Sequence, residues 1–193
     1  MNRRTKHLAC VLIAMATITA CKKDKDEVVT PTTPPVNEEE LITPLRIHFH
    51  SSGEVEHKHF VFTDLDGAGG NAPVITADTL SADTLYHVEI EVLNESVSPA
   101  DTITTEIEEE GDVHQFFYQV SGANATVAYA DTDANGLPIG LETMWTIGAA
   151  SNGTVLVTLR HEPDKTAAGV SSGDISNAGG ETDIAVSFPV VIE

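Results

Sequence analysis

Hydrophobic and polar residues alternate with a period of two along most of the chain after residue 44. Ile47 and Phe49 alternate with polar side chains, and in the next segment Phe60 and Phe62 alternate with residues that include His57, His59 and Val61. This period is typical of a strand with one buried face, because successive side chains point to opposite faces of a sheet. The pattern predicts β-strands over residues 45–50, 57–62, 86–92, 113–120, 125–130, 141–147, 154–161 and 183–192.

Turn-forming residues separate these segments. Gly, Asn and Ser gather at 67–71, 121–122, 135–136, 151–153 and 169–180, as expected for tight connections between short strands. A short helix is expected only at residues 98–110, with Ser98 as its cap and Pro99 at its first position. We therefore expect an all-β fold, an immunoglobulin-like or fibronectin type III-like antiparallel β-sandwich of seven to eight strands with at most one short helix.

The segment from Leu80 to Tyr86 resembles the tyrosine corner of fibronectin type III domains. In such a corner the tyrosine hydroxyl hydrogen-bonds to backbone a few residues upstream. Tyr86 is followed by the alternating apolar residues Val88 and Ile90. We expect Val88, and Val186 in the last strand, to be buried on sheet faces.

The N-terminal 20 residues have the composition of a secretory signal. A basic opening with Arg3, Arg4 and Lys6 precedes the apolar run 8–20, which is too short to span a bilayer. The sequence Ile18-Thr19-Ala20-Cys21 resembles the lipobox of bacterial lipoproteins, which implies that Cys21 is acylated, for example by palmitate, and becomes the mature N-terminus. An ordinary secretory signal with an incidental cysteine is the alternative.

Residues 21–44 are expected to form a lipidated tether. The charged run 22–27 resembles the surface-export signal of Bacteroidota lipoproteins, and a solvated spacer is the alternative. The following Pro- and Thr-rich stretch has too few apolar residues to pack. The sandwich domain is then residues 45–193, anchored at the outer membrane on its periplasmic face or at the cell surface, without a disulfide, because Cys10 lies inside the signal.

Charge excludes one class of partner. The formal charge is −20 at pH 7, with 30 acidic and 10 basic side chains, whereas nucleic-acid binding needs a basic surface. The sequence contains no Gly-x-Ser-x-Gly elbow, Walker loop, dinucleotide fingerprint or His-Glu-x-x-His helix. We expect a non-catalytic binding or structural module whose partner is an envelope protein, a glycan or a small ligand. An envelope hydrolase of unrecognised type remains an alternative.

Several local motifs between residue 37 and the C-terminus resemble a family of small Bacteroidota surface lipoproteins. Its members often carry the label "type 1 periplasmic binding fold superfamily", which would imply a two-lobed α/β solute binder. The sequence has no run of alternating strands and helices, so we expect the sandwich instead. The motifs that carry the resemblance include Asp64-Leu-Asp-Gly, Leu93-Asn-Glu-Ser, Leu159-Arg-His-Glu-Pro and Asn177-Ala-Gly-Gly-Glu-Thr-Asp.

Four histidines form the more specific candidate site. His48 and His50 share one face of their strand, and His57 and His59 share one face of the next. A symmetric hairpin with its loop at 51–56 would pair His50 with His57 and His48 with His59, with opposed Cβ atoms about 5 Å apart. Nitrogen ligands favour zinc, copper or nickel, so a Zn or Cu site is one hypothesis and an exposed polar strand face is the other.

A second cation motif occurs at residues 131–142. Asp131, Asp133, Asn135 and Glu142 have the spacing of a calcium-binding loop. That loop needs flanking helices, whereas strand patterns flank this segment, and Asn135-Gly136 is a common hairpin turn. A hairpin connection is therefore favoured over a Ca²⁺ site.

Overall fold

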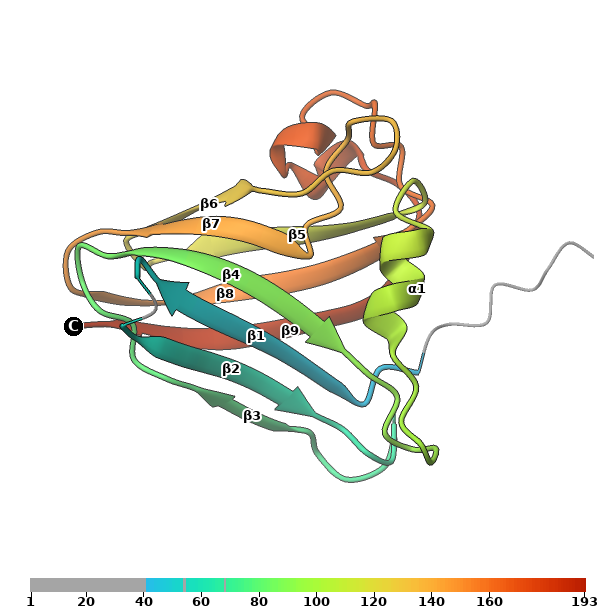
Figure 1. Cartoon of the computed structure of the whole chain (residues 1–193), viewed down its shortest axis with the longest axis horizontal. Coiled ribbons are helices and arrows are strands. Elements are labelled where there is room, and N and C mark those ends of the chain that lie inside the picture. The colour runs from blue at the N-terminus through green and yellow to red at the C-terminus, as the bar shows by residue number, and fades with distance from the viewer. Residues whose placement is uncertain (1–40, 54, 68) are drawn as a thin grey trace, which may run out of the picture. The chain divides into compact units, whose positions relative to one another are not determined.

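The computed structural model describes residues 41–53, 55–67 and 69–193, which form an all-β sandwich of two antiparallel sheets (Figure 1). One short α-helix, α1 (Ile103–Glu109), lies across one end of the sandwich, and the C-terminus lies at the other end. Two 3₁₀ turns, η1 (Val170–Ser172) and η2 (Ile175–Asn177), occur in the connection between the last two strands. The strands are β1 (Pro44–Ser51), β2 (His57–Thr63), β3 (Val74–Ala77), β4 (Leu85–Val92), β5 (His114–Ser121), β6 (Ala125–Tyr129), β7 (Glu142–Ile147), β8 (Ser151–His161) and β9 (Glu181–Ile192).

The strand order identifies the kind of sandwich. The larger sheet has the order β3-β2-β1-β4-β7-β6, and the smaller has the order β5-β8-β9. Strands β1, β4, β7 and β6 take the positions A, B, E and D of a constant-type immunoglobulin sandwich, and β5, β8 and β9 take the positions C, F and G. The β2–β3 hairpin extends this arrangement beyond β1, so the immunoglobulin-like alternative is the one that the topology matches.

The described residues form nine strands instead of the expected seven or eight. The additional strand, β3, pairs with β2 at the edge of the larger sheet. Val74 and Ile75 are exposed on it, so β3 has no buried face and no alternating pattern that the sequence could show.

The predicted apolar faces meet in one core between the sheets. Phe49 lies near its centre, with ring centroids 4.7 Å from Phe60, 5.8 Å from Tyr86 and 5.2 Å from Trp145. Val88 is fully buried and Val186 is 3% exposed, as the alternation predicts. The period-two pattern therefore identified the inward faces correctly.

The packed domain begins before the expected boundary at residue 45. Ile42 is 7% exposed and Thr43 is fully buried. The Thr43 amide donates to the Leu93 carbonyl at 3.0 Å. Residues 42–44 therefore belong to the sandwich and not to the tether, whereas the rest of that tether and the signal, residues 1–40, lie outside the described residues.

The helix begins later than the sequence predicts. Its N-cap is Thr102 and not Ser98, and it buries Ile103 and Ile107. Just before it, Asn94 and Asp101 exchange two backbone hydrogen bonds of 3.0 Å. This bridge holds the Asp101 backbone outside helical geometry, so the helix starts after it.

The Tyr86 hydroxyl makes the expected hydrogen bond to upstream backbone. It accepts from the Ser81 amide at 3.2 Å and donates to Glu56 Oε2 at 2.7 Å. Its place in the fold differs from the family pattern. Tyr86 is the second residue of β4, which has the position of strand B, whereas the usual corner tyrosine lies near the start of strand F. Here it fixes the turn between β3 and β4, at which Leu80 pairs with Ile192 of the other sheet.

Candidate functional site

The predicted histidine register is present in the β1–β2 hairpin. His48 lies opposite His59 and His50 lies opposite His57. On the other side of β1, His50 also faces His87 of β4. These five residues, His48, His50, His57, His59 and His87, are here called the outer histidine face, because they lie on the side of the larger sheet opposite to the core.

The closest pair of nitrogens in this face belongs to His50 and His57. Their Nδ1 atoms are 3.0 Å apart, so one ring donates a hydrogen bond to the other. Metal–nitrogen bonds of about 2.0–2.1 Å place neighbouring ligand nitrogens of a tetrahedral site roughly 3.3 Å apart. The nitrogens of the His50–His57 pair are therefore close to the spacing of two ligands of one ion.

Carboxylates lie beside the other three histidines. His48 Nε2 is 4.0 Å from Glu91, and His59 Nδ1 is 3.8 Å from Asp78. His87 lies between two acids, with Nδ1 3.6 Å from Glu89 and Nε2 3.5 Å from Glu142. At these separations the carboxylates act through their charge, which attracts cations to the histidines.

Electrostatics at His48 favour its neutral form. Burial lowers the pKa of its imidazole, and the neighbouring His59 lowers it further, against the opposite influence of Glu91. The neutral ring is the form that binds metal. His48 therefore stays available as a ligand at lower pH than an unperturbed histidine.

Two hollows adjoin this face. One of about 280 Å³ is lined by His50, His87, Glu89 and Met144, together with the loop residues 51–53. The other, of about 420 Å³, shares Glu89 and has further acidic side chains from α1, β7 and the 131–134 segment. A cation at the histidines would thus have carboxylates on one side.

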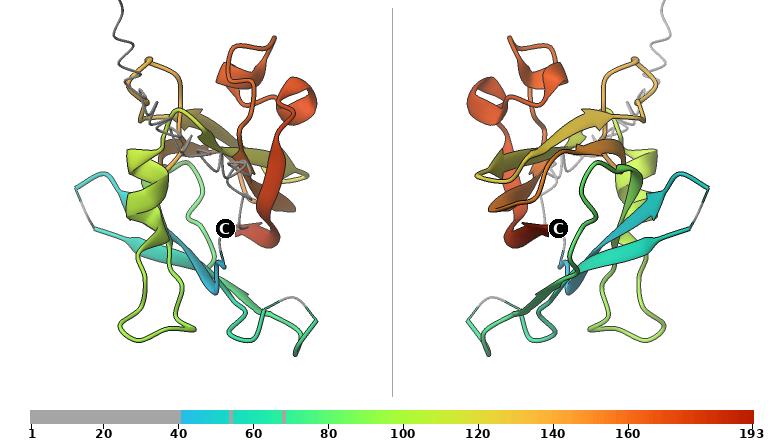
Figure 2. Two further views of the ribbon diagram at one scale, coloured as in Figure 1. Left: turned by 90° about the vertical axis from the view of Figure 1, so that its right-hand side faces the viewer. Right: turned by 90° about the vertical axis from the view of Figure 1, so that its left-hand side faces the viewer.

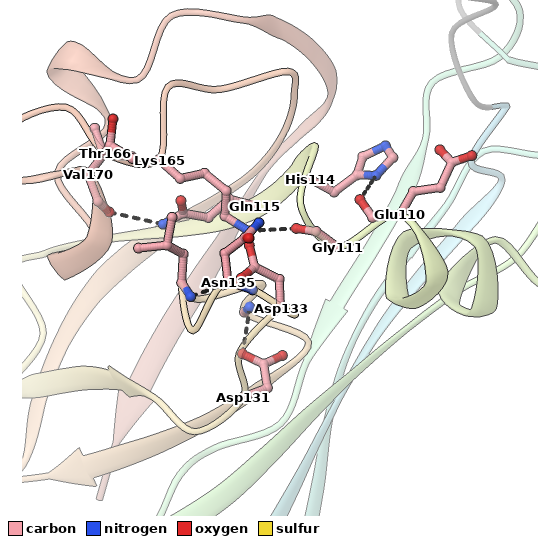
Figure 3. A network of polar contacts seen from close by, with 12 residues as sticks. Glu110, Gly111, His114, Gln115, Asp131, Asp133, Asn135, Lys165, Thr166 and Val170 are labelled. Atoms are coloured by element: carbon pink, nitrogen blue, oxygen red, sulfur yellow. Dashed lines mark hydrogen bonds and ion pairs between the residues drawn. The ribbon is translucent and has the colours of Figure 1, made fainter.

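The calcium motif does not form a cation loop. Asp131 accepts backbone hydrogen bonds from Gly140 and Glu142 at 2.8 and 2.9 Å. Asp133 accepts from the Asn135 and Leu137 amides and binds Lys165 Nζ at 2.8 Å (Figure 3). The Glu142 carboxylate lies beside His87 instead. The four motif residues are therefore not brought together as Ca²⁺ ligands. Their segment connects the paired strands β6 and β7, as the flanking strand patterns favoured.

A buried ion pair fixes the connection between β8 and β9 to this loop. Lys165 is 4% exposed, and its Nζ also donates to the Gly111 carbonyl at 2.6 Å. Burial raises the pKa of Asp133, but the hydrogen bonds from Lys165, Leu137 and Asn135 outweigh it and lower the pKa overall. The Asp133 carboxylate is thus charged and bound to Lys165, and this ion pair serves as a structural link.

Two long connections, residues 64–73 and 163–182, lie at the end of the sandwich that carries α1 (Figure 1). Residues 64–73 are closed by Asp66, whose Oδ2 accepts two hydrogen bonds from Asn71. Residues 163–182 cover the outer side of β5, where Val170 and Ala178 pack on Phe117.

The sequence analysis did not identify one further cluster. His114, His161 and Asp183 are the one group of described residues with three potential ligand atoms within 4.8 Å of one another, and the four predicted histidines do not meet this criterion. These residues come from β5, β8 and β9. No spacing in the sequence brings them together, because their proximity depends on the order of strands in the smaller sheet.

No protein-family profile matches the chain, and the searches of curated proteins and of solved structures found no match. Among the described residues, no helix has the length and hydrophobicity needed to cross a bilayer. The proposed lipid attachment at Cys21 lies outside the described residues.

Proposed function

We propose that this chain is a lipid-anchored protein of the bacterial outer membrane whose sandwich domain is a non-catalytic binding module for transition-metal cations. The anchoring rests on the sequence, in which Cys21 follows a basic opening and an apolar run. The resemblance to small Bacteroidota surface lipoproteins supports the same location.

One observation carries the metal hypothesis: five histidines from three adjacent strands lie on one outer face, with two nitrogens 3.0 Å apart. Imidazole nitrogen favours Zn²⁺, Cu²⁺ or Ni²⁺ over Ca²⁺ or Mg²⁺. A third donor is close by, since His87 lies opposite His50 and lines the same hollow. Rotation of the His87 side chain would bring it to an ion held by the first pair.

The surrounding charge also favours cations. Residues 41–193 contain 24 acidic and four basic side chains. Acidic surfaces raise the local concentration of cations and their rate of association. The carboxylates beside His48, His59 and His87 contribute to this field at the site itself.

Anchoring is tested by Cys21→Ala in the full chain, expressed with a labelled fatty-acid analogue. We expect the variant to lose the label and to leave the membrane fraction, because no acyl chain can be attached. Ser52→Ala, in the hairpin loop of the domain, is the control and should remain labelled. Labelled Cys21→Ala protein in the membrane fraction would contradict the lipoprotein assignment.

Metal binding is tested by calorimetric titration of the full chain with Zn²⁺ and Cu²⁺. A variant with alanine at His48, His50, His57 and His59 should take up at least one equivalent less than the parent. Affinity of the parent should fall as pH drops below about 6.5, because protonated imidazole cannot bind a metal.

The matched control replaces Thr126 and Thr146 by alanine. These threonines are paired on β6 and β7 of the same sheet and carry no metal-binding group, so uptake should equal that of the parent. Equal uptake by the parent and the histidine variant, or no uptake by either, would exclude the outer histidine face as a metal site.

A further inference from the structure

A second pair of histidines ends the inner face of the smaller sheet. Going along β5 and β8, the paired residues on this face are Phe116 opposite Leu159 and then His114 opposite His161. The first pair is fully buried in the core. The histidine rings stack with centroids 4.7 Å apart and an interplanar angle of 23°. At the end of the sandwich that carries α1, the inward-facing side chains of the smaller sheet therefore change from apolar residues to two histidines.

The third member of the cluster comes from an irregularity in β9. Leu159 pairs with Ile184 and Arg160 pairs with Thr182, so the register shifts by one residue and Asp183 lies in a bulge of β9. A bulge of this kind changes the direction of a side chain, and bulges are frequent beside functional sites. Here potential ligand atoms of Asp183 and the two histidines lie within 4.8 Å of one another.

The orientation of His114 leaves one nitrogen for a ligand. Its Nδ1 lies 3.1 Å from the Glu110 carbonyl oxygen (Figure 3). A carbonyl oxygen can only accept, so Nδ1 carries the proton and Nε2 has a lone pair when the ring is neutral. Metal-binding histidines commonly have this arrangement, with the second ring nitrogen donating to a carbonyl or carboxylate.

His114 is the most buried member of the cluster. The residue is 3% exposed. Burial lowers the pKa of its imidazole, and the adjacent His161 lowers it further, while the Glu110 carbonyl and the Asp183 charge act in the opposite direction. His161 and Asp183 are half-buried, so an ion could reach them from solution.

We propose that His114, His161 and Asp183 form a binding site for one divalent transition cation, with Zn²⁺ as the best match. Two histidines and one carboxylate are a common set of three protein ligands for zinc, with water completing the tetrahedron. Zinc would bind His114 through Nε2. Ligand atoms around zinc lie roughly 3.3 Å apart, so side-chain rotation of His161 and Asp183 must bring their ligand atoms closer to Nε2 of His114.

This site is separate from the outer histidine face. Its residues belong to β5, β8 and β9 of the smaller sheet, whereas the outer face is built on β1, β2 and β4 of the larger sheet. Views along the sandwich show these sheets as distinct layers (Figure 2). All seven histidines after residue 40 therefore belong to one of two clusters.

The test uses as its parent protein the full chain with alanine at all five histidines of the outer histidine face, so that this face does not contribute. Zn²⁺ affinity is measured by competition with a chromophoric chelator, and Co²⁺ is added to record its visible absorption. We expect one equivalent of Zn²⁺ and a cobalt spectrum typical of nitrogen and oxygen ligands.

In this parent, His161→Gln and Asp183→Asn should each weaken Zn²⁺ binding by at least about tenfold, in the range found when the environment of a metal site is damaged. Both residues are half-buried, so circular dichroism is used to confirm that the variants fold. Glu162→Gln is the matched control, because it removes an exposed carboxylate next to His161 without removing a ligand, and affinity should stay within about twofold.

Two results would overturn the proposal. One is a parent protein that binds no Zn²⁺, and the other is a folded His161→Gln, Asp183→Asn double variant with parental affinity. Neither result bears on the outer histidine face, which is tested with the wild-type chain and its own variants.

Discussion

Glu56 contacts three polar side chains, one on its own hairpin and two at the start of β4 and the turn before it. Its carboxylate accepts hydrogen bonds from the Tyr86 hydroxyl at 2.7 Å and from Ser81 Oγ at 2.8 Å, and it binds Lys58 Nζ at 2.8 Å. Together these contacts lower the pKa of Glu56 from 4.5 to about 2, and the hydrogen bond from Lys58 has the largest effect. The charged carboxylate therefore links the β1–β2 hairpin to the turn before β4.

The residue-scale prediction follows from this pKa. The folded state binds a proton on Glu56 less readily than the unfolded state, so the stabilisation is complete above pH 4.5 and is lost as pH falls toward 2. Glu56→Gln should lower the free energy of unfolding at pH 7 by about 1 kcal/mol, allowing for partial exposure. The difference from wild type should shrink between pH 4.5 and pH 2 in urea unfolding experiments.

Glu109→Gln removes an exposed carboxylate from α1 and serves as the control for this series. Its unfolding curves should follow those of wild type throughout. A Glu56→Gln variant whose deficit does not change with pH would show that the Glu56 charge does not stabilise the fold.

At the scale of elements, alternation along each strand decides which side chains enter the core. Val88 lies on β4 of the larger sheet, and Val186 lies on β9 of the smaller sheet. Both point into the core between the two sheets, and both are buried. Val74, on edge strand β3, is 62% exposed. The same residue type thus occupies two environments, which gives a matched comparison.

We predict that Val88→Asp and Val186→Asp each cost about 3–5 kcal/mol, because each would bury a carboxylate with no cationic partner. Val74→Asp should change stability by less than about 0.5 kcal/mol. Thermal and urea unfolding measure all three. Parental melting of both core variants would mean that the strand faces are assigned incorrectly.

At the scale of the whole molecule, acidic groups far outnumber basic ones. All four basic side chains after residue 40 already have partners: Arg46 binds Glu91 and Glu95, Lys58 binds Glu56, Lys165 binds Asp133, and Arg160 donates to the Gly180 carbonyl. The remaining carboxylates repel one another across the surface, and this repulsion opposes the compact state.

Screening this repulsion should stabilise the domain. Raising NaCl from about 10 mM to about 300 mM, which shortens the Debye length from roughly 30 Å to under 10 Å, should raise Tm by a few degrees. The scans contain a chelator, so that metal binding does not contribute. A Tm that falls with salt would show that the four ion pairs and hydrogen bonds outweigh the surface repulsion.

The sequence determined the features that depend on neighbouring residues. The period of two gave the buried faces, because side chains of any strand alternate regardless of its neighbours. The symmetric loop at 51–56 gave the register of His48 with His59 and of His50 with His57, because a short hairpin fixes the pairing of its two strands. Tyr86 and its hydrogen bond to Ser81 were likewise predictable, since only five residues separate them.

Only the tertiary structure decided which distant segments lie side by side. His87 joins the outer histidine face because β4 pairs with β1, and His114, His161 and Asp183 meet because β5, β8 and β9 share a sheet. The sequence placed each of these residues on a strand, but the alternation is the same whichever strand is the neighbour. Strand order is set by the packing of the whole core, which is why the hairpin site was predictable and the second cluster was not.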